Sequence, residues 1–193
     1  MSVDDADVED DAGKTEGVGG QTDVACAFVA EARRLLVGDY LPKIERCVER
    51  LTEEQVWWRA GEHSNSVGNL LLHLAGNVRQ WVVCGLGGAE DTREREREFD
   101  ERERVPRERL VSALCATLEE ADGVLERLDA SKLLEGRRIQ GLEVTALVAL
   151  FRAVEHFSTH TGQIILLTKQ LTGDDLEFVE GEDGVPRYKW SRP

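Results

Sequence analysis

Hydrophobic residues recur at the three- and four-residue spacing of amphipathic helices in four long stretches of the chain. These stretches are residues 23–51, 67–86, 106–129 and 143–171. Pro42 interrupts the first stretch and is expected to kink or split that helix, because proline has no backbone N–H to donate. Apart from a short extended piece at residues 137–140, the pattern indicates no convincing sheet. It therefore predicts an all-α fold, a four-helix bundle.

The segments between the second and third helices and before the second helix are polar. Residues 52–66 are expected to form a loop, although they contain Trp57 and Trp58. Residues 90–106 alternate acidic and basic side chains without an apolar period. Like charges two and four residues apart repel each other, so this segment is predicted to be a solvated crossover with marginal helicity.

The length of 193 residues suits one domain with tails. Residues 1–22 contain seven acidic side chains, several glycines and Lys14 as the sole basic residue, so residues 1–21 are expected to be a disordered acidic tail. The helical domain is predicted to cover residues 22–178, with a C-terminal tail at residues 179–193. The start of the chain does not resemble a signal peptide, and no apolar run is long enough to span a bilayer. A cytoplasmic location and no membrane partner are expected.

The formal net charge of −14 argues against a nucleic-acid partner, because phosphate binding requires clustered lysine and arginine. The four cysteines form no C-x-x-C pair, which excludes zinc-finger and thioredoxin-like sites. They are expected to be buried free thiols in a reducing compartment.

Two of the predicted helices carry a line of polar residues among apolar ones. An unpaired polar group costs roughly 1–3 kcal/mol to bury, so the two lines are expected to face each other across a polar pocket or a bound ion. On the helix at residues 67–86 the line consists of Asn69, His73, Gly76, Asn77 and Gln80; on the helix at residues 143–171 it consists of Arg152, His156, His160 and Gln163.

Three imidazoles would converge between these helices. His156 and His160 are four residues apart on one helical face, a spacing that lets both reach one ion, and His73 would supply a third nitrogen. The alternative is a hydrogen-bonded network of core histidines without a metal. Phe157 and Thr159 occupy the positions where H-E-x-x-H and H-x-x-E-H motifs need glutamate, so a zincin-type protease is not expected. No paired Glu-x-x-His motif is present, which favours a single ion.

In these histidine segments the sequence resembles the DinB-like (damage-inducible, YfiT-type) superfamily. The similarity rests on "SVGNLLLHLAGNVRQW", "RRIQGLEVT" and "VEHFSTHTGQIILLTKQLTGDDL". It implies a metal-binding four-helix bundle in which His73, His156 and His160 hold a divalent ion, often in a homodimer. Trp57, Trp58 and Trp81 are candidates for the apolar dimer contact.

The first functional hypothesis is an enzyme, because three neutral histidines leave coordination positions open. Such an enzyme would be a transferase that uses a low-molecular-weight thiol of the bacillithiol or mycothiol type, or a metal-dependent hydrolase. The second hypothesis is a non-enzymatic metal-binding protein of the stress response. Zinc, nickel and iron all suit three imidazoles. Candidate supporting residues around the ion are Glu155, Gln163, Asn77 and Thr159, and the expected partners are a small-molecule substrate or thiol.

Overall fold

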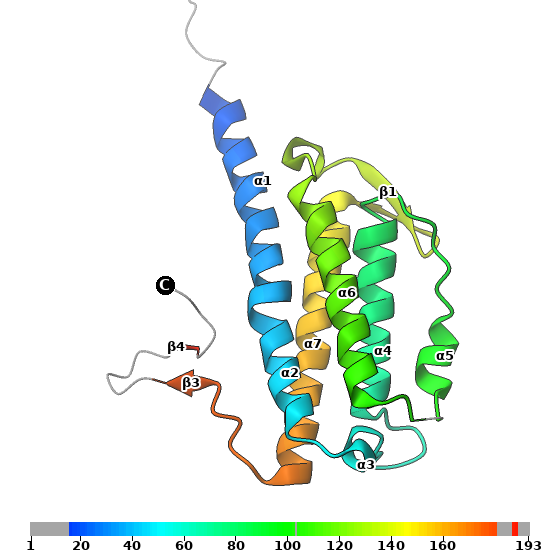
Figure 1. Cartoon of the computed structure of the whole chain (residues 1–193). Coiled ribbons are helices and arrows are strands. Elements are labelled where there is room, and N and C mark those ends of the chain that lie inside the picture. Colours follow the sequence, from blue (N-terminus) through cyan, green and yellow to red (C-terminus); the bar gives the residue numbers. More distant parts are fainter. Residues whose placement is uncertain (1–15, 103, 181–186, 189–193) are drawn as a thin grey trace, which may run out of the picture.

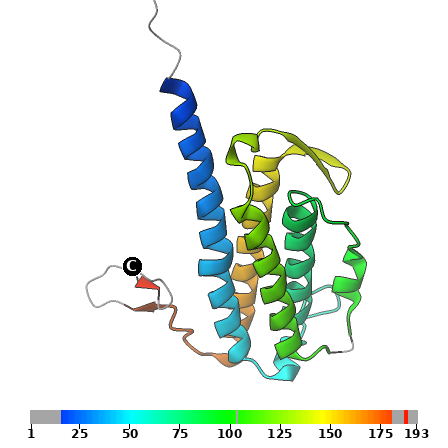
Figure 2. The same ribbon diagram turned by 45° about the horizontal axis from the view of Figure 1, so that its top comes forward.

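The computed structural model describes residues 16–102, 104–180 and 187–188. Four long helical rods lie side by side in both views (Figures 1 and 2). The rods are α1 (Glu16–Leu35) continued by the π-helical turn η1 (Leu36–Tyr40) and α2 (Leu41–Glu49); α4 (Val67–Val78) continued by the π-helical turn η2 (Arg79–Cys84); α6 (Arg107–Glu126); and α7 (Ala146–Thr172). The predicted four-helix bundle is confirmed.

Short elements connect the rods. They are α3 (Glu53–Val56), α5 (Arg95–Asp100), the 3-10 turn η3 (Ala130–Lys132), β1 (Gly136–Ile139), β2 (Leu142–Thr145), β3 (Val179–Glu180) and β4 (Arg187–Tyr188). The extended piece predicted at residues 137–140 belongs to an antiparallel hairpin in which β1 pairs with β2. β3 also pairs with β4 in the antiparallel direction, over two residues. Two small ribbons thus accompany the bundle.

Pro42 disturbs the first rod as predicted. The π-helical turn η1 ends two residues before it, and the N–H of Leu41 donates to the carbonyl of Leu36, five residues back. This wider turn accommodates the missing N–H of Pro42 without separating the two halves of the rod. The rod begins earlier than predicted, because residues 16–21, assigned to the disordered tail, form the first turns of α1. The rest of that predicted tail, residues 1–15, lies outside the described residues.

The core lies between the four rods and is formed by their apolar faces. Side chains that are fully buried there include Leu36, Leu74, Leu114, Leu150 and Phe157. Local signals place the helix ends: Ser66 forms a capping box with Asn69 at the start of α4, Thr145 caps α7, and Gly173 ends α7 in the left-handed conformation.

The segment at residues 52–66 is more ordered than the predicted loop. Thr52 and Gln55 form a capping box around the short helix α3. Trp57 then packs on α4, where a Cβ on Gly68 would come within 2.9 Å of its ring. Its Nε1 donates a hydrogen bond to the carbonyl of Val105, 3.1 Å away. Val56 and Trp57 of this segment therefore belong to the core, whereas residues 60–63 are exposed.

Burial also decides which tryptophans are available for a dimer contact. Trp57 and Trp81 are 9% and 3% exposed, whereas Trp58 is 42% exposed. Of the three tryptophans expected to supply that contact, the first and last are therefore engaged in the core.

The chain after α7 folds back along the first rod. Leu176 is fully buried, and its carbonyl accepts a hydrogen bond from Arg46 of α2. In the ranges that the structure describes, no helix has the length and apolar character needed to cross a membrane.

Candidate metal centre

Three histidines meet between α4 and α7. His73 is almost fully buried on α4, and His156 and His160 are half-buried one helical turn apart on α7. The Nε2 atoms of His73 and His156 are 2.8 Å apart, and one ring nitrogen of each of the three histidines lies within 4.8 Å of the others. The structure therefore brings together all three residues that the sequence predicted as ligands.

His73 is oriented by an ion pair from the crossover. Its Nδ1 lies 2.8 Å from Oε2 of Glu98. Arg93 holds the same carboxylate with two hydrogen bonds, from Nε to Oε1 at 2.7 Å and from Nη2 to Oε2 at 2.8 Å. The side chains of Arg93 and Glu98 are only 6% and 11% exposed. A paired guanidinium and carboxylate are thus enclosed directly behind His73.

The ionised state of Glu98 determines which ring nitrogen of His73 carries the hydrogen. Burial alone would raise the pKa of Glu98, but hydrogen bonds from Arg93 and His73 outweigh it and lower this pKa below its usual value. An ionised carboxylate can only accept, so Nδ1 of His73 carries the hydrogen. In this tautomer the lone pair of His73 is on Nε2, which points towards His156. Carboxylates orient metal-binding histidines in the same way.

The two histidines of α7 are held in their neutral form. Burial, together with the neighbouring charges of His160, His73, Arg93 and Arg95, lowers the pKa of His156 to about 4. Burial also lowers the pKa of His160, and its hydrogen bond to Gln163 offsets only part of that effect. Neutral imidazole is the form that binds a metal, so both rings are ready to act as ligands at neutral pH.

The donor set fits a single transition-metal ion. Two nitrogens bound to one ion at about 2.0–2.1 Å cannot be more than about 4.2 Å apart. The three ring nitrogens, all within 4.8 Å of one another, approach this limit without rearrangement of the helices. Three imidazoles suit zinc, nickel or iron, and no carboxylate or thiol competes for the same position in the group.

Two residues of the polar line of α4, Asn69 and Gln80, face the crossover rather than α7. Nδ2 of Asn69 donates to the carbonyl of Glu98 at 2.8 Å, and Nε2 of Gln80 donates to Asp91 at 2.7 Å. Gln80 also accepts from Nη1 of Arg93 at 2.9 Å. Asn69 and Gln80 thus hold the crossover against the part of the helical rod that lies between them. The prediction that the two lines face each other across a polar pocket is therefore wrong for Asn69 and Gln80, whereas His73 and Asn77 line one cavity together with Arg152 and His156 of α7.

Gly76 leaves space for this arrangement. It lies one turn after His73, and a Cβ at this position would come within 2.0 Å of Oε1 of Glu98 and 2.9 Å of Nε of Arg93. Any larger residue would push the ion pair away from α4. Most of the crossover is exposed, as predicted, and α5 contributes no fully buried residue. Arg93 and Glu98 are the exceptions, because their side chains are enclosed against α4. Sequence reasoning missed both residues.

The four predicted supporting residues have different positions. Gln163 accepts a hydrogen bond from Nδ1 of His160 at 2.7 Å. Asn77 and Glu155 line a cavity beside His73. Thr159 donates to the backbone carbonyl of Glu155 at 3.0 Å, a bond within its own helix. Gln163 thus contacts a histidine of the group, whereas the hydroxyl of Thr159 is engaged elsewhere.

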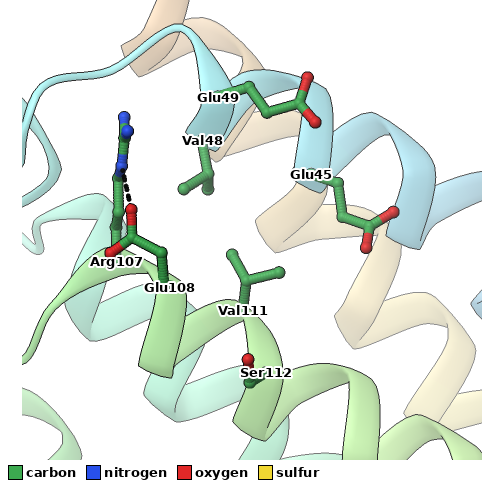
Figure 3. A pocket seen from close by; sticks show the side chains of 7 residues that line it. All are labelled: Glu45, Val48, Glu49, Arg107, Glu108, Val111 and Ser112. Carbon is green, nitrogen blue, oxygen red and sulfur yellow. Dashed lines mark hydrogen bonds and ion pairs between the residues drawn. The ribbon is translucent and has the colours of Figure 1, made fainter.

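A second cavity, of about 360 Å³, lies between α2 and α6 (Figure 3). Its polar lining consists of Glu45, Glu49, Arg107, Glu108 and Ser112, and Arg107 is paired with Glu108 at 3.0 Å. None of the histidines lines it. This groove lacks the ligand chemistry of the cluster between α4 and α7.

Three of the four cysteines, Cys47, Cys84 and Cys115, are not activated as nucleophiles. Burial raises the pKa of Cys47 to about 11, and burial together with Glu45 raises that of Cys115 to about 11. Burial and Asp91 also raise the pKa of Cys84. The expectation that all four are buried is wrong, because only Cys47 is fully enclosed and Cys26 is exposed.

Comparison with known proteins agrees with the fold. Residues 23–184 match the family described as "Protein of unknown function (DUF1572)". The chain belongs to this family. Among solved structures, this chain is similar to a DinB-like protein, YjoA, from Bacillus subtilis, with a TM-score of 0.54 and 18% sequence identity. The similarity covers 79% of this chain and 93% of that one. The DinB-like fold inferred from the sequence is thereby confirmed. No curated protein matches the sequence.

Proposed function

We propose that the protein binds one divalent transition-metal ion through His73, His156 and His160 and uses it to activate a low-molecular-weight thiol for transfer to an electrophile. The observation that carries this proposal is the convergence of three imidazoles, with His73 held by the buried Glu98–Arg93 pair. A buried hydrogen-bonded network alone would not require a carboxylate that fixes the tautomer in the form with a free Nε2 lone pair.

The surrounding residues support an open rather than a closed site. Structural zinc sites have four protein ligands, whereas catalytic sites keep a position for water or substrate. Here three histidines converge, and a cavity opens beside His73 and His156. A divalent ion in this position would supply Lewis acidity, which favours the deprotonated form of a bound thiol or water. Glu155, exposed at the rim of the cavity, can accept a proton from an incoming ligand.

The second candidate function is metal binding without catalysis. It is favoured by Cys47 and Cys115, whose raised pKa values disfavour a thiolate, and by the position of Thr159, whose hydroxyl is bound within its helix. In this alternative the ion would serve to hold α4 against α7. A hydrolase would need the same ligands, with Glu155 as the base.

Elemental analysis of the untagged, full-length protein tests the metal site. About one equivalent of metal is expected, together with a higher melting temperature with metal than with chelator. His160→Ala should abolish both, whereas His63→Ala, in the loop before α4, should change neither. A protein without stoichiometric metal, or equal retention by the two variants, would contradict the proposal.

A turnover screen separates the enzyme from the binder. Bacillithiol, mycothiol and glutathione would each be offered with a set of electrophiles, and thiol consumption would be measured for the wild type and for His160→Ala. Consumption that depends on His160 supports the transferase. A fully metal-loaded protein that is silent with all three thiols would favour non-catalytic metal binding.

A further inference from the structure

A small cavity opens beside the histidine cluster, and its lining is unusually basic for this protein. Its volume is about 210 Å³, and it is bordered by His73 and His156. Three arginines, Arg93, Arg95 and Arg152, line it together with a single carboxylate, Glu155. The whole chain carries a net charge of −14, so the cavity is a local positive region on an acidic molecule. Such a region attracts small anions.

Two of these arginines are available for a ligand. Arg93 is neutralised by Glu98. Arg95 and Arg152 have no carboxylate within 4.0 Å in the part of the chain that the structure describes. A guanidinium that is not engaged by a carboxylate retains its fork of N–H donors, which matches the oxygens of a carboxylate or phosphate.

Aromatic rings hold the two free guanidinium groups at the cavity. The Cζ atom of Arg95 lies 4.9 Å from the centroid of the Phe99 ring, and Phe99 in turn contacts His73 with a centroid distance of 4.6 Å. Cζ of Arg152 lies 4.9 Å from the Trp81 ring. Stacking on an aromatic face restricts a guanidinium while leaving its edge free to donate hydrogen bonds. Both cations are therefore positioned at the edge of the histidine cluster.

The β1–β2 hairpin supplies a polar group to the same cavity. Gln140 and Gly141 form its two-residue turn, both with positive φ (52° and 77°), as a type I′ turn requires. This turn brings Gln140 to the cavity lining, to which Asn77 of α4 also contributes. Amide groups at these two positions can bind the remaining polar atoms of a small ligand.

We propose that this cavity is an oxyanion subsite, in which Arg95 and Arg152 bind the carboxylate or phosphate of a small ligand beside the ion. The inference rests on the proposed function and specifies its substrate class. Three imidazole ligands contribute no negative charge, so a divalent ion would strengthen the attraction for an anion. The volume of about 210 Å³ lies below the roughly 300–1,000 Å³ of sites for drug-sized ligands, which favours a small acid.

Calorimetric titration of the full-length protein tests this subsite. Malonate, succinate and inorganic phosphate would each be titrated into the zinc-loaded and the chelator-treated protein. Arg95→Gln and Arg152→Gln should each weaken binding of the preferred anion at least tenfold. Arg109→Gln, which removes the same charge from the exposed face of α6, should leave binding unchanged. Arg152→Lys should recover part of the loss, since it restores the charge without the fork. Circular dichroism of each variant verifies folding.

The anion that binds most tightly identifies the source: a preference for malonate or succinate assigns a carboxylate, and a preference for phosphate assigns a phosphate. The subsite is overturned if no anion binds to either form, or if Arg95→Gln and Arg152→Gln behave like Arg109→Gln. A protein that takes up no metal but binds an anion through Arg152 would refute the proposed metal role and retain the subsite. Tight metal binding without arginine-dependent anion binding would refute the subsite and retain the proposed metal role.

Discussion

The Nδ1 atom of His73 lies 2.8 Å from Oε2 of Glu98, across 25 residues of sequence. This contact joins a buried helix of the bundle to a crossover whose sequence alternates acidic and basic residues. Because the carboxylate is also held by Arg93 through two hydrogen bonds, it is fixed in position before any ligand arrives. The relationship makes Glu98 the supporting residue with the most to contribute to metal affinity.

Replacing this carboxylate should weaken metal binding without removing a ligand. Glu98→Gln keeps the shape of the side chain but loses the charge that fixes the hydrogen on Nδ1 of His73. A reduction of about 10- to 100-fold in metal affinity is expected, the usual cost of removing such a partner. A competition titration with a chromogenic chelator measures it. Glu96→Gln, on the exposed face of the same short helix, is the matched control and should bind metal like the wild type.

A methyl group on Gly76 should disturb the same pair from the opposite side. Its Cβ would meet Glu98 and Arg93, so Gly76→Ala is expected to displace the carboxylate and weaken metal binding to a similar extent as Glu98→Gln. Helix propensity alone favours alanine by about 1 kcal/mol. Gly162→Ala on α7, where no atom lies within 4 Å of the added Cβ, should show that gain in a denaturation experiment while binding metal normally. Unchanged metal affinity in Gly76→Ala would refute the crowding argument.

The hydrogen bond from His160 to Gln163 should contribute less than the one from His73 to Glu98. Gln163 is neutral and exposed, so water can replace it when the side chain is removed. Gln163→Ala is expected to weaken metal binding less than tenfold in the same chelator competition. Thr159→Ala should have no effect on affinity, because the Thr159 hydroxyl bonds to the backbone of its own helix. A loss in Gln163→Ala equal to that of Glu98→Gln would contradict this order.

The ion pair between α1 and α6 should produce a specific pH dependence of stability. Asp122 accepts two hydrogen bonds from Arg33, at 2.6 and 2.9 Å, and this contact lowers the pKa of Asp122 below its usual value. Because the folded pKa is depressed, the stabilisation is present above about pH 4 and is lost as the pH falls through the folded pKa. Asp122→Asn should therefore destabilise the protein by about 1 kcal/mol or less at neutral pH.

Urea denaturation at pH 7 and at pH 2–3 measures this difference. The gap between wild type and Asp122→Asn should shrink at the lower pH, where the wild-type carboxyl group is itself protonated. Asp23→Asn, an equal change of charge on an exposed position of α1, should show no such gap at either pH. A gap that does not depend on pH would mean that the contact acts through packing rather than charge.

The histidine ligands could be predicted from the sequence because their relationship is largely local. His156 and His160 share a helical face at any bundle geometry, and His73 stood out as a polar residue inside an otherwise apolar helix. Helix boundaries at Ser66, Thr145 and Gly173 were equally accessible, since each depends on capping within a few residues.

The residues around these ligands could not be predicted in the same way. Residues 93–102 contain several arginines and glutamates with no period that distinguishes one from another. Which of them faces His73 depends on where Asn69 and Gln80 hold the crossover, a long-range relationship. Only Gly76 offered a hint, because a glycine within a helix indicates that another group approaches closely. Gln140 likewise reaches the cavity through a turn whose distant contact no local pattern encodes.

The bundle and its crossover contribute different properties: the bundle forms the core, and the crossover supplies side chains to the site. The crossover supplies Arg93, Arg95 and Glu98 to the site, yet α5 adds no fully buried side chain to the core. Substitutions in this one surface segment can therefore change the ligand preference of the centre at little expense in folding stability. The bundle can therefore serve as a scaffold. Grafting a different crossover between α4 and α6 is a direct route to changing the ligand preference of the centre while all three histidines stay in place.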